Sequence, residues 1–308
     1  AGAGRLTLWT DRSIFGGVSL TDERPDLSDR SLDTAYPITG EQVRSLHQDS
    51  WASIPGLLDL DTVEKLRDAL LAAEPRTTIS GPDKPPADPN ALLSHEGVAW
   101  RDPFVRSVAT SRRLSSAVVG LLEQLDAVFC QDISFFKPEG ARAIPYHQDY
   151  SYWPFDRKGC VTLWIALVDM TPEMGPLRYL KGSHLEGPLG LIEQRDIRDA
   201  YPHLADNEIV GGKAMKAGDA QAHWELTLHG SRRNDGPGRR EAVAFRYIRS
   251  DTIYIGLTHP HYDQFGLAPG KRFVDNDHFP HLNAEGLIDP SRDDISSFTY
   301  ETGDAGEP

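Results

Sequence analysis

The spacing of apolar residues changes once along the chain, near residue 126. Before it, apolar residues recur every three or four positions, which is typical of amphipathic helices that pack on a core. This half of the sequence predicts a short buried strand in SIPGLLD and three helices, at 39–50, 59–75 and 102–125. Thr39 lies near the start of the first helix, with Glu41 and Gln42 in its first turn, which is typical of a capped helix start.

Two segments of this half have no helical or strand period. Residues 1–38 are rich in Asp, Ser, Pro and Arg, which predicts an irregular arm over the surface. Residues 76–95 contain four prolines and predict a long surface loop, a kind of segment that often borders an active site.

After Asp126 the pattern alternates between apolar and polar residues in short runs that end at Gly, Pro or Asp. No motif repeats at a fixed period, and no helical pattern separates the runs, so the sequence predicts a β-sandwich or jelly roll. The predicted organisation is a single domain over 1–308: a mainly β core at 126–260, N-terminal helices packed outside it at 39–125, and a polar C-terminal extension at 261–308. The last ten or so residues, which end in ETGDAGEP, are expected to be disordered.

Composition narrows the choice of partner. The 308 residues include 32 Lys plus Arg and 46 Asp plus Glu, a net charge of 32 − 46 = −14, which argues against nucleic acid or an anionic membrane surface as partner. Cys130 and Cys160 are too few for a disulfide scaffold, and AGAGRLTLWT lacks the basic start and apolar run of a secretory signal. The expectation is a cytoplasmic protein with a small-molecule partner.

The segment IPYHQDYSYW holds the first candidate chemistry. On a strand, His147 and Asp149 would point to the same face and could bind one ion. His-x-Asp is a common tripeptide, however, and the pair alone indicates a turn leaving a strand. His229, 82 residues later, completes the two-histidine, one-carboxylate set of non-haem Fe(II) oxygenases. Arg240 follows 11 residues further on, and a planar guanidinium suits the distal carboxylate of a 2-oxo acid cosubstrate.

With these residues in place, the sequence resembles the phytanoyl-CoA dioxygenase family of Fe(II)/2-oxoglutarate-dependent oxygenases. The resemblance covers about 39–282 and includes EQVRSLHQDSWASIPGLLDLDTVEKLRDAL, YHQDYSYW, TLWIALVDMTPEMGPLRYLKGSH, GDAQAHWELTLHGSRRN and RREAVAFRYI. It implies a double-stranded β-helix, or cupin-like jelly roll, with helices packed outside.

The resemblance also implies roles for particular residues. His147, Asp149 and His229 would bind iron, and Arg240 would anchor 2-oxoglutarate. Three further residues would contact the same cosubstrate, namely Ser231, Trp164 and Lys137. Gln131 sits where some members contact cosubstrate or substrate.

Asp149 bears on the reaction type. In halogenating relatives a small residue replaces this carboxylate so that chloride reaches the iron, so its presence here implies hydroxylation or another oxidation. The implied reaction consumes Fe(II)-bound 2-oxoglutarate and O2, releases succinate and CO2, and oxidises a C–H bond of a small or medium metabolite, as in natural-product biosynthesis. Desaturation, epimerisation and ring closure remain open, and the alternative class is a cupin-like metal-binding isomerase or binding protein without oxygenase turnover.

Other residues have weaker indications. Tyr150 and Trp153, among the aromatic residues around Asp149, are candidates for a substrate-facing wall, and His223 for substrate or for support of the barrel. Asn234 is expected to order the loop before Arg240. The remaining candidates are expected to be structural: turn residues at Gly175, Pro176, Gly182, Ser183 and His184, solvated Arg232, Arg233 and Arg239, and surface-loop histidines His259, His261, His278 and His281.

Overall fold

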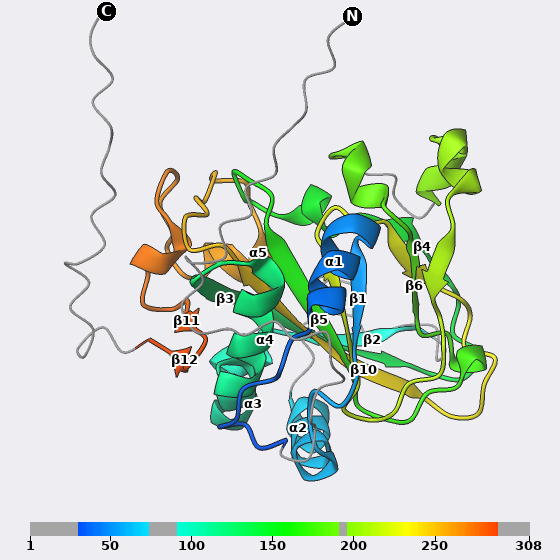
Figure 1. Cartoon of the computed structure of the whole chain (residues 1–308), viewed down its shortest axis with the longest axis horizontal. Helices are drawn as coiled ribbons and strands as arrows, with labels where there is room; N and C mark the ends of the chain where they lie inside the picture. Colours follow the sequence, from blue (N-terminus) through cyan, green and yellow to red (C-terminus); the bar gives the residue numbers. More distant parts are fainter. Residues whose placement is uncertain (1–29, 74–90, 191–195, 289–308) are drawn as a thin grey trace, which may run out of the picture.

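A computed structural model of the protein describes residues 30–73, 91–190 and 196–288. Its framework is two antiparallel β-sheets that form the predicted mainly β jelly roll, with helices outside (Figure 1). The larger sheet has the order β1-β8-β5-β10-β3-β11-β12, with β2 also paired to β3. Its strands are β1 Trp51–Ile54, β2 Leu93–Glu96, β3 Asp126–Lys137, β5 Cys160–Ala166, β8 Ala220–Trp224, β10 Arg240–Ile248, β11 His281–Asn283 and β12 Gly286–Leu287.

The smaller sheet has the order β4-β9-β6-β7. Its strands are short: β4 Ile144–His147, β6 Leu177–Leu180, β7 Ile209–Gly211 and β9 His229–Ser231. A tight turn at Gly175 leads into β6. Gly175, before β6, has φ of +70°, and a Cβ there would lie 2.5 Å from the carbonyl oxygen of Arg232, so only glycine fits.

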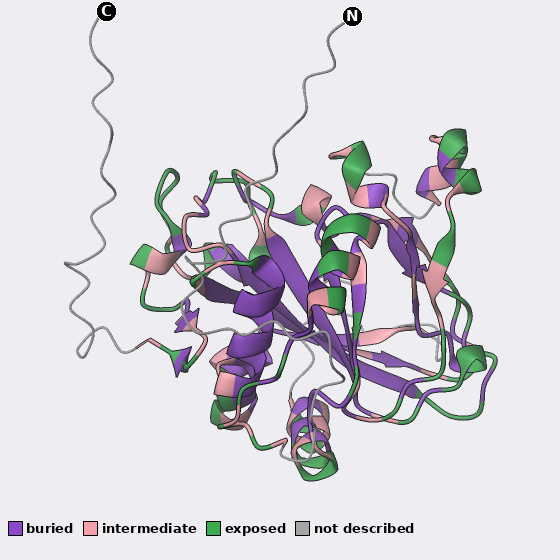
Figure 2. Ribbon diagram, viewed as in Figure 1, coloured by how far each residue is buried: buried purple, intermediate pink, exposed green. Residues whose placement is uncertain are grey.

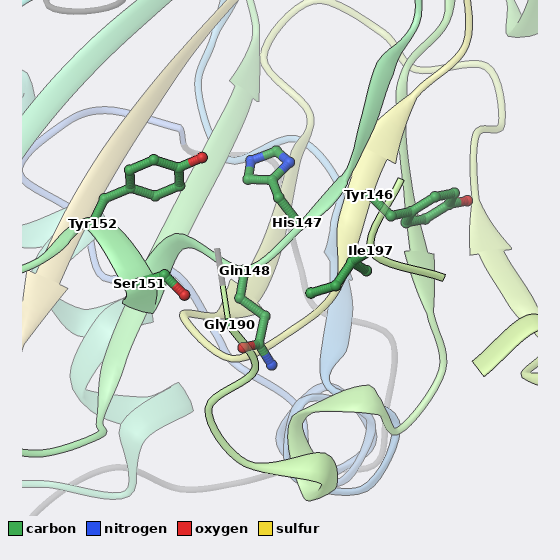
Figure 3. A pocket seen from close by; sticks show the side chains of 7 residues that line it. All are labelled: Tyr146, His147, Gln148, Ser151, Tyr152, Gly190 and Ile197. Atoms are coloured by element: carbon green, nitrogen blue, oxygen red, sulfur yellow. The ribbon is translucent and has the colours of Figure 1, made fainter. Parts of the chain in front are cut away.

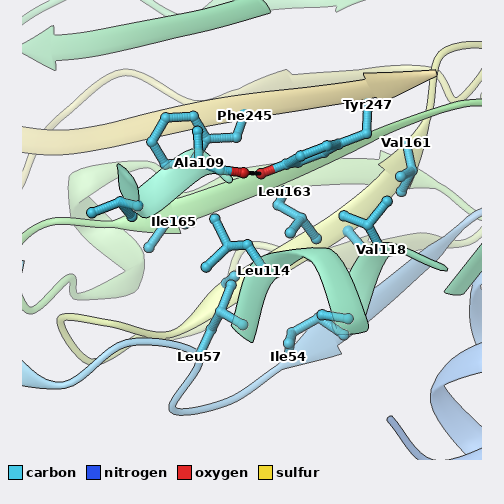
Figure 4. Packing of buried hydrophobic residues seen from close by; sticks show 14 of the residues in the cluster. Ile54, Leu57, Ala109, Leu114, Val118, Val161, Leu163, Ile165, Phe245 and Tyr247 are labelled. Atoms are coloured by element: carbon cyan, nitrogen blue, oxygen red, sulfur yellow. Dashed lines mark hydrogen bonds between the residues drawn. The ribbon is translucent and has the colours of Figure 1, made fainter. Parts of the chain in front are cut away.

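Helices cover the face of the larger sheet that points away from β4 and β6 (Figure 1). They are α1 Gly40–Asp49, α2 Leu60–Ala72, α3 Pro103–Ala109 and α4 Arg112–Leu122, with the single turn α5 Pro260–Asp263 near the end of the described chain. Leu114 and Val118 of α4 pack on Leu163 and Phe245 of the sheet, and the Tyr247 hydroxyl donates to the Ala109 carbonyl at 2.8 Å (Figure 4). This apolar layer is the largest buried cluster of the described residues (Figure 2).

Short 3-10 turns join these elements. Their bounds are Val98–Trp100, Asp149–Tyr152, Pro172–Met174, Ser183–Glu186, Ile197–Asp199, Pro202–Asp206 and Phe273–Asp275. Among the described residues, no helix has the length and apolar character needed to cross a membrane.

The helix starts follow the capping signals in the sequence. Thr39 and Gln42 form the predicted capping box of α1, and the Asp59 carboxylate accepts from the Thr62 amide at 2.7 Å at the start of α2. The single helix predicted at 102–125 is wrong, because it is two. Ser111 caps a new helix start at α4 directly after α3 ends at Ala109, and its hydroxyl accepts from the Leu114 amide.

Other boundaries also differ from the prediction. The β core is not confined to 126–260, because β1, β2, β11 and β12 add strands from both sides of that range. β2 also begins within the segment predicted as a loop at 76–95 and ends one residue beyond it. The arm at 1–38 does not run over the surface at its end, where Tyr36 and Ile38 are 2% exposed and pack in the helix-covered core. Residues 1–29 of the arm, 74–90 of the loop and the terminal 289–308 lie outside the described residues.

Candidate metal and anion site

The three predicted metal ligands lie close together at the β4–β9 pair of the smaller sheet. His147 ends β4 and His229 begins β9, and the two residues are direct partners across this antiparallel pair. Asp149 does not lie on the same strand as His147, contrary to the prediction, because β4 ends at His147 and Asp149 begins a 3-10 turn. The turn still brings Asp149 Oδ1 to 3.8 Å from His147 Nε2 and 3.7 Å from His229 Nε2.

These ligand atoms all lie within 4.8 Å of one another, and they are the one group of this kind among the described residues. No second metal cluster is found there, although His261, predicted in a surface loop, is buried and lies 3.1 Å (Nε2) from the Cys130 carbonyl.

The protonation of both histidine ligands is set by the backbone. Nδ1 of His147 lies 2.9 Å from the Pro145 carbonyl oxygen, and Nδ1 of His229 lies 2.9 Å from the Thr227 carbonyl oxygen. A carbonyl only accepts, so each Nδ1 carries the proton and each Nε2 presents a lone pair to the centre of the group. Burial, followed by the nearby His147, lowers the pKa of His229 to about 4, so this imidazole is neutral at pH 7 and suited to bind a metal ion.

Asp149 supplies the negative charge of the group. Burial alone would raise its pKa, but the Arg246 guanidinium and the neighbouring histidines outweigh burial and hold the pKa of this carboxyl well below its usual range. Arg246 Nη2 donates to Asp149 Oδ2 at 3.2 Å. Two imidazoles and a carboxylate around one point are the donor set of non-haem Fe(II) sites, so the residues present fit such an ion.

A pair of buried cations lies beside the ligands. Arg240 and Lys137 are direct partners on β10 and β3, and both are almost fully buried. Lys137 Nζ donates to Ser231 Oγ at 2.9 Å and to the Arg232 carbonyl, and Ser231 is two residues from ligand His229. Burial, then the charge of Arg240, lowers the pKa of Lys137 to about 7, and burial lowers the pKa of Arg240 to about 10.

Neither cation forms an ion pair with any carboxylate of the described residues, as the ion pairs found there all involve other groups. Arg240 Nη1 donates to the Gly175 carbonyl at 3.1 Å, but its buried Nε has no partner among the described residues. Trp164 packs 5.3 Å from the guanidinium carbon. Two buried cations without a counter-ion are costly, so this subsite fits a bound anion such as the predicted 2-oxoglutarate carboxylate.

The structure also places the four residues predicted to contact substrate, Gln131, Trp153, His223 and Tyr150. Gln131 and Trp153 contact Arg246: Gln131 Oε1 accepts from its Nη1 at 2.8 Å, and the Trp153 ring lies 5.0 Å from its guanidinium carbon. His223 is 1% exposed, its Nε2 lies 4.0 Å from Asp149 Oδ2, and neither ring nitrogen has a hydrogen-bond partner in the described structure. Tyr150 is half-buried in the 3-10 turn that begins at Asp149.

A small open pocket adjoins ligand His147 (Figure 3). His147 is the one predicted metal ligand in its lining. Tyr152, 47% exposed, places its ring 6.4 Å from the His147 ring. The other lining residues are Tyr146, Gln148, Ser151, Gly190 and Ile197.

Two structural predictions near the site are confirmed. The Asn234 amide donates to the carbonyls of Lys137, Pro138 and Gly238, at 2.9–3.1 Å, and so ties the loop before Arg240 to the end of β3. The three other arginines of this segment, Arg232, Arg233 and Arg239, are exposed.

Arg246 was missed by the sequence analysis. Residues two apart on a strand share a face, so counting from Arg240 in RREAVAFRYI places Arg246 on the same inner face and would have identified it.

The fold and these residues define a jelly-roll protein with a two-histidine, one-carboxylate metal centre beside a cationic anion subsite. Residues 46–242 match the profile of the family described as phytanoyl-CoA dioxygenase (PhyH). The chain therefore belongs to the phytanoyl-CoA dioxygenase family.

Individual relatives agree with this membership. The chain is 26% identical over 241 residues to ectoine dioxygenase of Stutzerimonas stutzeri (strain A1501), covering 70% of this chain and 78% of that protein. It is 31% identical over 157 residues to phytanoyl-CoA dioxygenase of Arabidopsis thaliana, covering 49% and 54%. The matches to phytanoyl-CoA dioxygenases of rat, Arabidopsis and rice span 36% to 54% of those proteins' lengths.

Solved structures share the fold. The non-haem alpha-ketoglutarate-dependent carbocyclase SnoK from nogalamycin biosynthesis superposes with a TM-score of 0.67 at 22% identity, covering 80% of this chain and 97% of SnoK. EctD from S. alaskensis, solved with 2-oxoglutarate and 5-hydroxyectoine, gives 0.62 at 19% identity, covering 82% and 90%. The predicted cupin-like jelly roll is confirmed.

Proposed function

We propose that this protein is an Fe(II)- and 2-oxoglutarate-dependent oxygenase that oxidises a C–H bond of a small or medium metabolite. The observation that carries the proposal is a two-histidine, one-carboxylate group beside two buried cations, Lys137 and Arg240, that have no carboxylate partner among the described residues. Lys137 donates to Ser231, two residues from ligand His229. A metal-binding protein without oxygenase turnover has no use for an anion subsite on the facing sheet beside its metal ligands. Family membership and neighbours solved with iron and 2-oxoglutarate support the same cofactors here.

Each residue has a defined task in this proposal. Iron with bound 2-oxoglutarate supplies the activation of O2, and 2-oxoglutarate leaves as succinate and CO2. His147, His229 and Asp149 would hold the metal on one side. Arg240 would receive the distal carboxylate of 2-oxoglutarate through its free N–H groups, with Lys137 and Ser231 beside it, and the Trp164 ring keeps water from that ion pair.

The reaction type follows from Asp149 and the pocket. A retained carboxylate ligand leaves no place for a halide at that position, so the proposed reaction is a hydroxylation or a related oxidation. SnoK is described as a carbocyclase and SnoN, with a TM-score of 0.64 at 20% identity, as an epimerase, both from nogalamycin biosynthesis. These neighbours support a natural-product substrate, with the aromatic pocket at Tyr146 and Tyr152 as its entrance.

The decisive experiment is anaerobic addition of Fe(II) and 2-oxoglutarate to the metal-free protein. We expect the visible charge-transfer absorption of an iron-bound 2-oxo acid. If the folded protein gives no such band, the proposal is wrong. Addition of O2 should then release succinate, and candidate metabolites that accelerate this release identify the substrate class.

Two variants complete the test. His147→Ala should abolish both the band and succinate release, because it removes one of three metal ligands. Arg233→Ala, which removes an exposed arginine paired with Asp235, is the matched control and should behave like the wild-type protein. Succinate release by His147→Ala at the wild-type rate would exclude this ligand assignment.

A further inference from the structure

The two oxygens of the Asp149 carboxylate face different partners. Oδ1 lies 3.8 and 3.7 Å from the Nε2 atoms of His147 and His229, where a shared metal ion would bind. Oδ2 is turned away from that point and accepts from Arg246 Nη2 at 3.2 Å. A carboxylate free of such a donor can bind a metal through one oxygen or through both.

Arg246 is itself held in place from two further sides. Its Nη1 donates to Gln131 Oε1 at 2.8 Å, and the Trp153 ring lies 5.0 Å from its guanidinium carbon. The Gln131 amide has a fixed orientation, because its Nε2 donates to the Glu96 carboxylate and its oxygen must therefore point to Arg246. A continuous chain of side-chain contacts therefore runs from Glu96 on β2 through Gln131 on β3 and Arg246 on β10 to the metal ligand Asp149.

We propose that Arg246, braced by Gln131, is a positioning residue that keeps Asp149 a one-oxygen metal ligand. This inference rests on the proposed function. With Oδ2 engaged by the guanidinium, the ion meets three protein atoms and keeps its remaining positions open for the two donor atoms of 2-oxoglutarate and for O2. Without that restraint, Oδ2 would rotate onto the metal and compete with 2-oxoglutarate for a position.

A simpler role for Arg246 is to neutralise a buried carboxylate. The two roles differ in what they require of the side chain. Neutralisation needs only a positive charge, which lysine also supplies, whereas positioning needs the planar fork that reaches Asp149 and Gln131 together. Arg246→Lys therefore separates the two roles, and Arg246→Gln removes both.

The first measurement is anaerobic titration of the Fe(II)-loaded protein with 2-oxoglutarate, followed through the charge-transfer band. We expect the apparent dissociation constant of 2-oxoglutarate to rise by about tenfold or more in both Arg246→Gln and Arg246→Lys, within the range typical of residues that orient metal ligands. Gln131→Leu, which removes only the brace, should raise it by about threefold, a smaller effect than loss of the direct contact. Arg249→Gln, at an arginine paired with Asp251, is the matched control and should leave it unchanged.

The second measurement uses Co(II) alone, without 2-oxoglutarate. A second carboxylate oxygen replaces a water ligand and so changes the ligand set of the metal. The visible absorption of the Co(II) protein should therefore differ from wild type in both Arg246 variants and stay unchanged in Arg249→Gln. Thermal unfolding of each metal-free variant establishes that it is folded. If Arg246→Gln does not fold, Arg246→Lys and Gln131→Leu decide the outcome.

Three results bear on the inference in distinct ways. Values within twofold of wild type for the folded Arg246 variants in both measurements overturn it. Wild-type values for Arg246→Lys beside impaired values for Arg246→Gln also overturn it, because charge alone would then suffice. A wild-type protein that gives no charge-transfer band contradicts the proposed function instead, and the Co(II) spectra still test the positioning of Asp149.

Discussion

Two buried arginines on the same face of strand β10 stand in opposite electrostatic situations. Arg240 and Arg246 are 1% and 8% exposed, lie six residues apart, and each packs against a tryptophan. Arg246 has an ion pair with Asp149 and a hydrogen bond to Gln131. Arg240 has a backbone carbonyl and no carboxylate among the described residues.

The presence or absence of a protein counter-ion thus distinguishes a buried cation with a structural role from one that binds a ligand. A buried guanidinium whose counter-ion is a protein carboxylate completes its electrostatics on folding. One without such a partner keeps a desolvation cost that a bound anion relieves, so it binds that anion strongly. Ala242 and Ala244, between the two arginines, are buried in one apolar cluster with Trp164, so the two cationic ends of the face are separated by packed apolar residues.

The largest effect on metal binding and stability is expected from removing Asp149, the carboxylate that pairs with Arg246. Asp149→Ala should abolish Fe(II) binding and also destabilise the metal-free protein by about 3–5 kcal/mol, because Arg246 becomes an uncompensated buried charge. Urea unfolding of the metal-free variant measures the loss. The double variant Asp149→Ala/Arg246→Met should recover most of the stability without recovering metal binding. An unchanged urea midpoint for Asp149→Ala would contradict the assigned dependence of Arg246 on Asp149.

Removing Arg240, which has no carboxylate partner among the described residues, should weaken ligand binding and leave the fold stable. Arg240→Gln is expected to weaken 2-oxoglutarate binding by about 100-fold, the loss of one or two charge-assisted hydrogen bonds. It should leave Co(II) affinity and the stability of the metal-free protein unchanged or slightly improved, because no protein ion pair is lost. Calorimetric titration gives both affinities. Arg239→Gln, which loses only a half-exposed pair with Glu241, is the neighbouring control.

The third prediction concerns pH at the Arg240 end of the strand. Burial and Arg240 lower the pKa of Lys137 to about 7, and a bound carboxylate favours the charged amine, so binding of 2-oxoglutarate is coupled to proton uptake. Affinity should be full below pH 7 and fall by about tenfold as pH rises from 7 to 9. Lys137→Met should bind more weakly at pH 6 and lose this dependence. A pH-independent wild-type affinity would show that Lys137 keeps its charge throughout.

The smallest effect is expected from Asn234, which only orders the loop before Arg240. Asn234→Ala removes the donor to three carbonyls, so 2-oxoglutarate affinity should fall by about threefold to tenfold, against about 100-fold for Arg240 itself. Co(II) affinity at the Arg246 end should not change. Equal losses at both ends would mean that the loop supports the whole barrel rather than one end of β10.

The sequence contains local signals for much of this architecture. Capping residues at Thr39 and Asp59 mark two helix starts, and alternation after Asp126 marks the strands, because these patterns depend on neighbours in the chain. The strands at 281–287 could not be found in this way. They are two or three residues long and have no pattern of their own. β11 is a strand because it pairs with β3, more than 150 residues earlier, and β12 because it pairs with β11.

The same distinction between local and long-range signals holds for the site. The ligand triad and Arg240 follow from residue type and spacing in one sequence. The ion pair between Asp149 and Arg246 does not, because it joins residues 97 positions apart whose contact depends on how the two sheets face each other. The two ring nitrogens of His223 that lack hydrogen-bond partners among the described residues can likewise be found only when the surroundings of His223 in space are known.

The carbonyl contacts of the two histidine ligands have a consequence for the order of folding. In each case the acceptor is the residue two positions earlier, Pro145 for His147 and Thr227 for His229. For each ligand, a contact within three consecutive residues therefore determines which ring nitrogen faces the metal. This contact is present as soon as the local backbone has its final conformation. The histidines are oriented by local structure, whereas the carboxylate is oriented only when β10 has joined the sheet, so the centre is complete only after this long-range contact has formed.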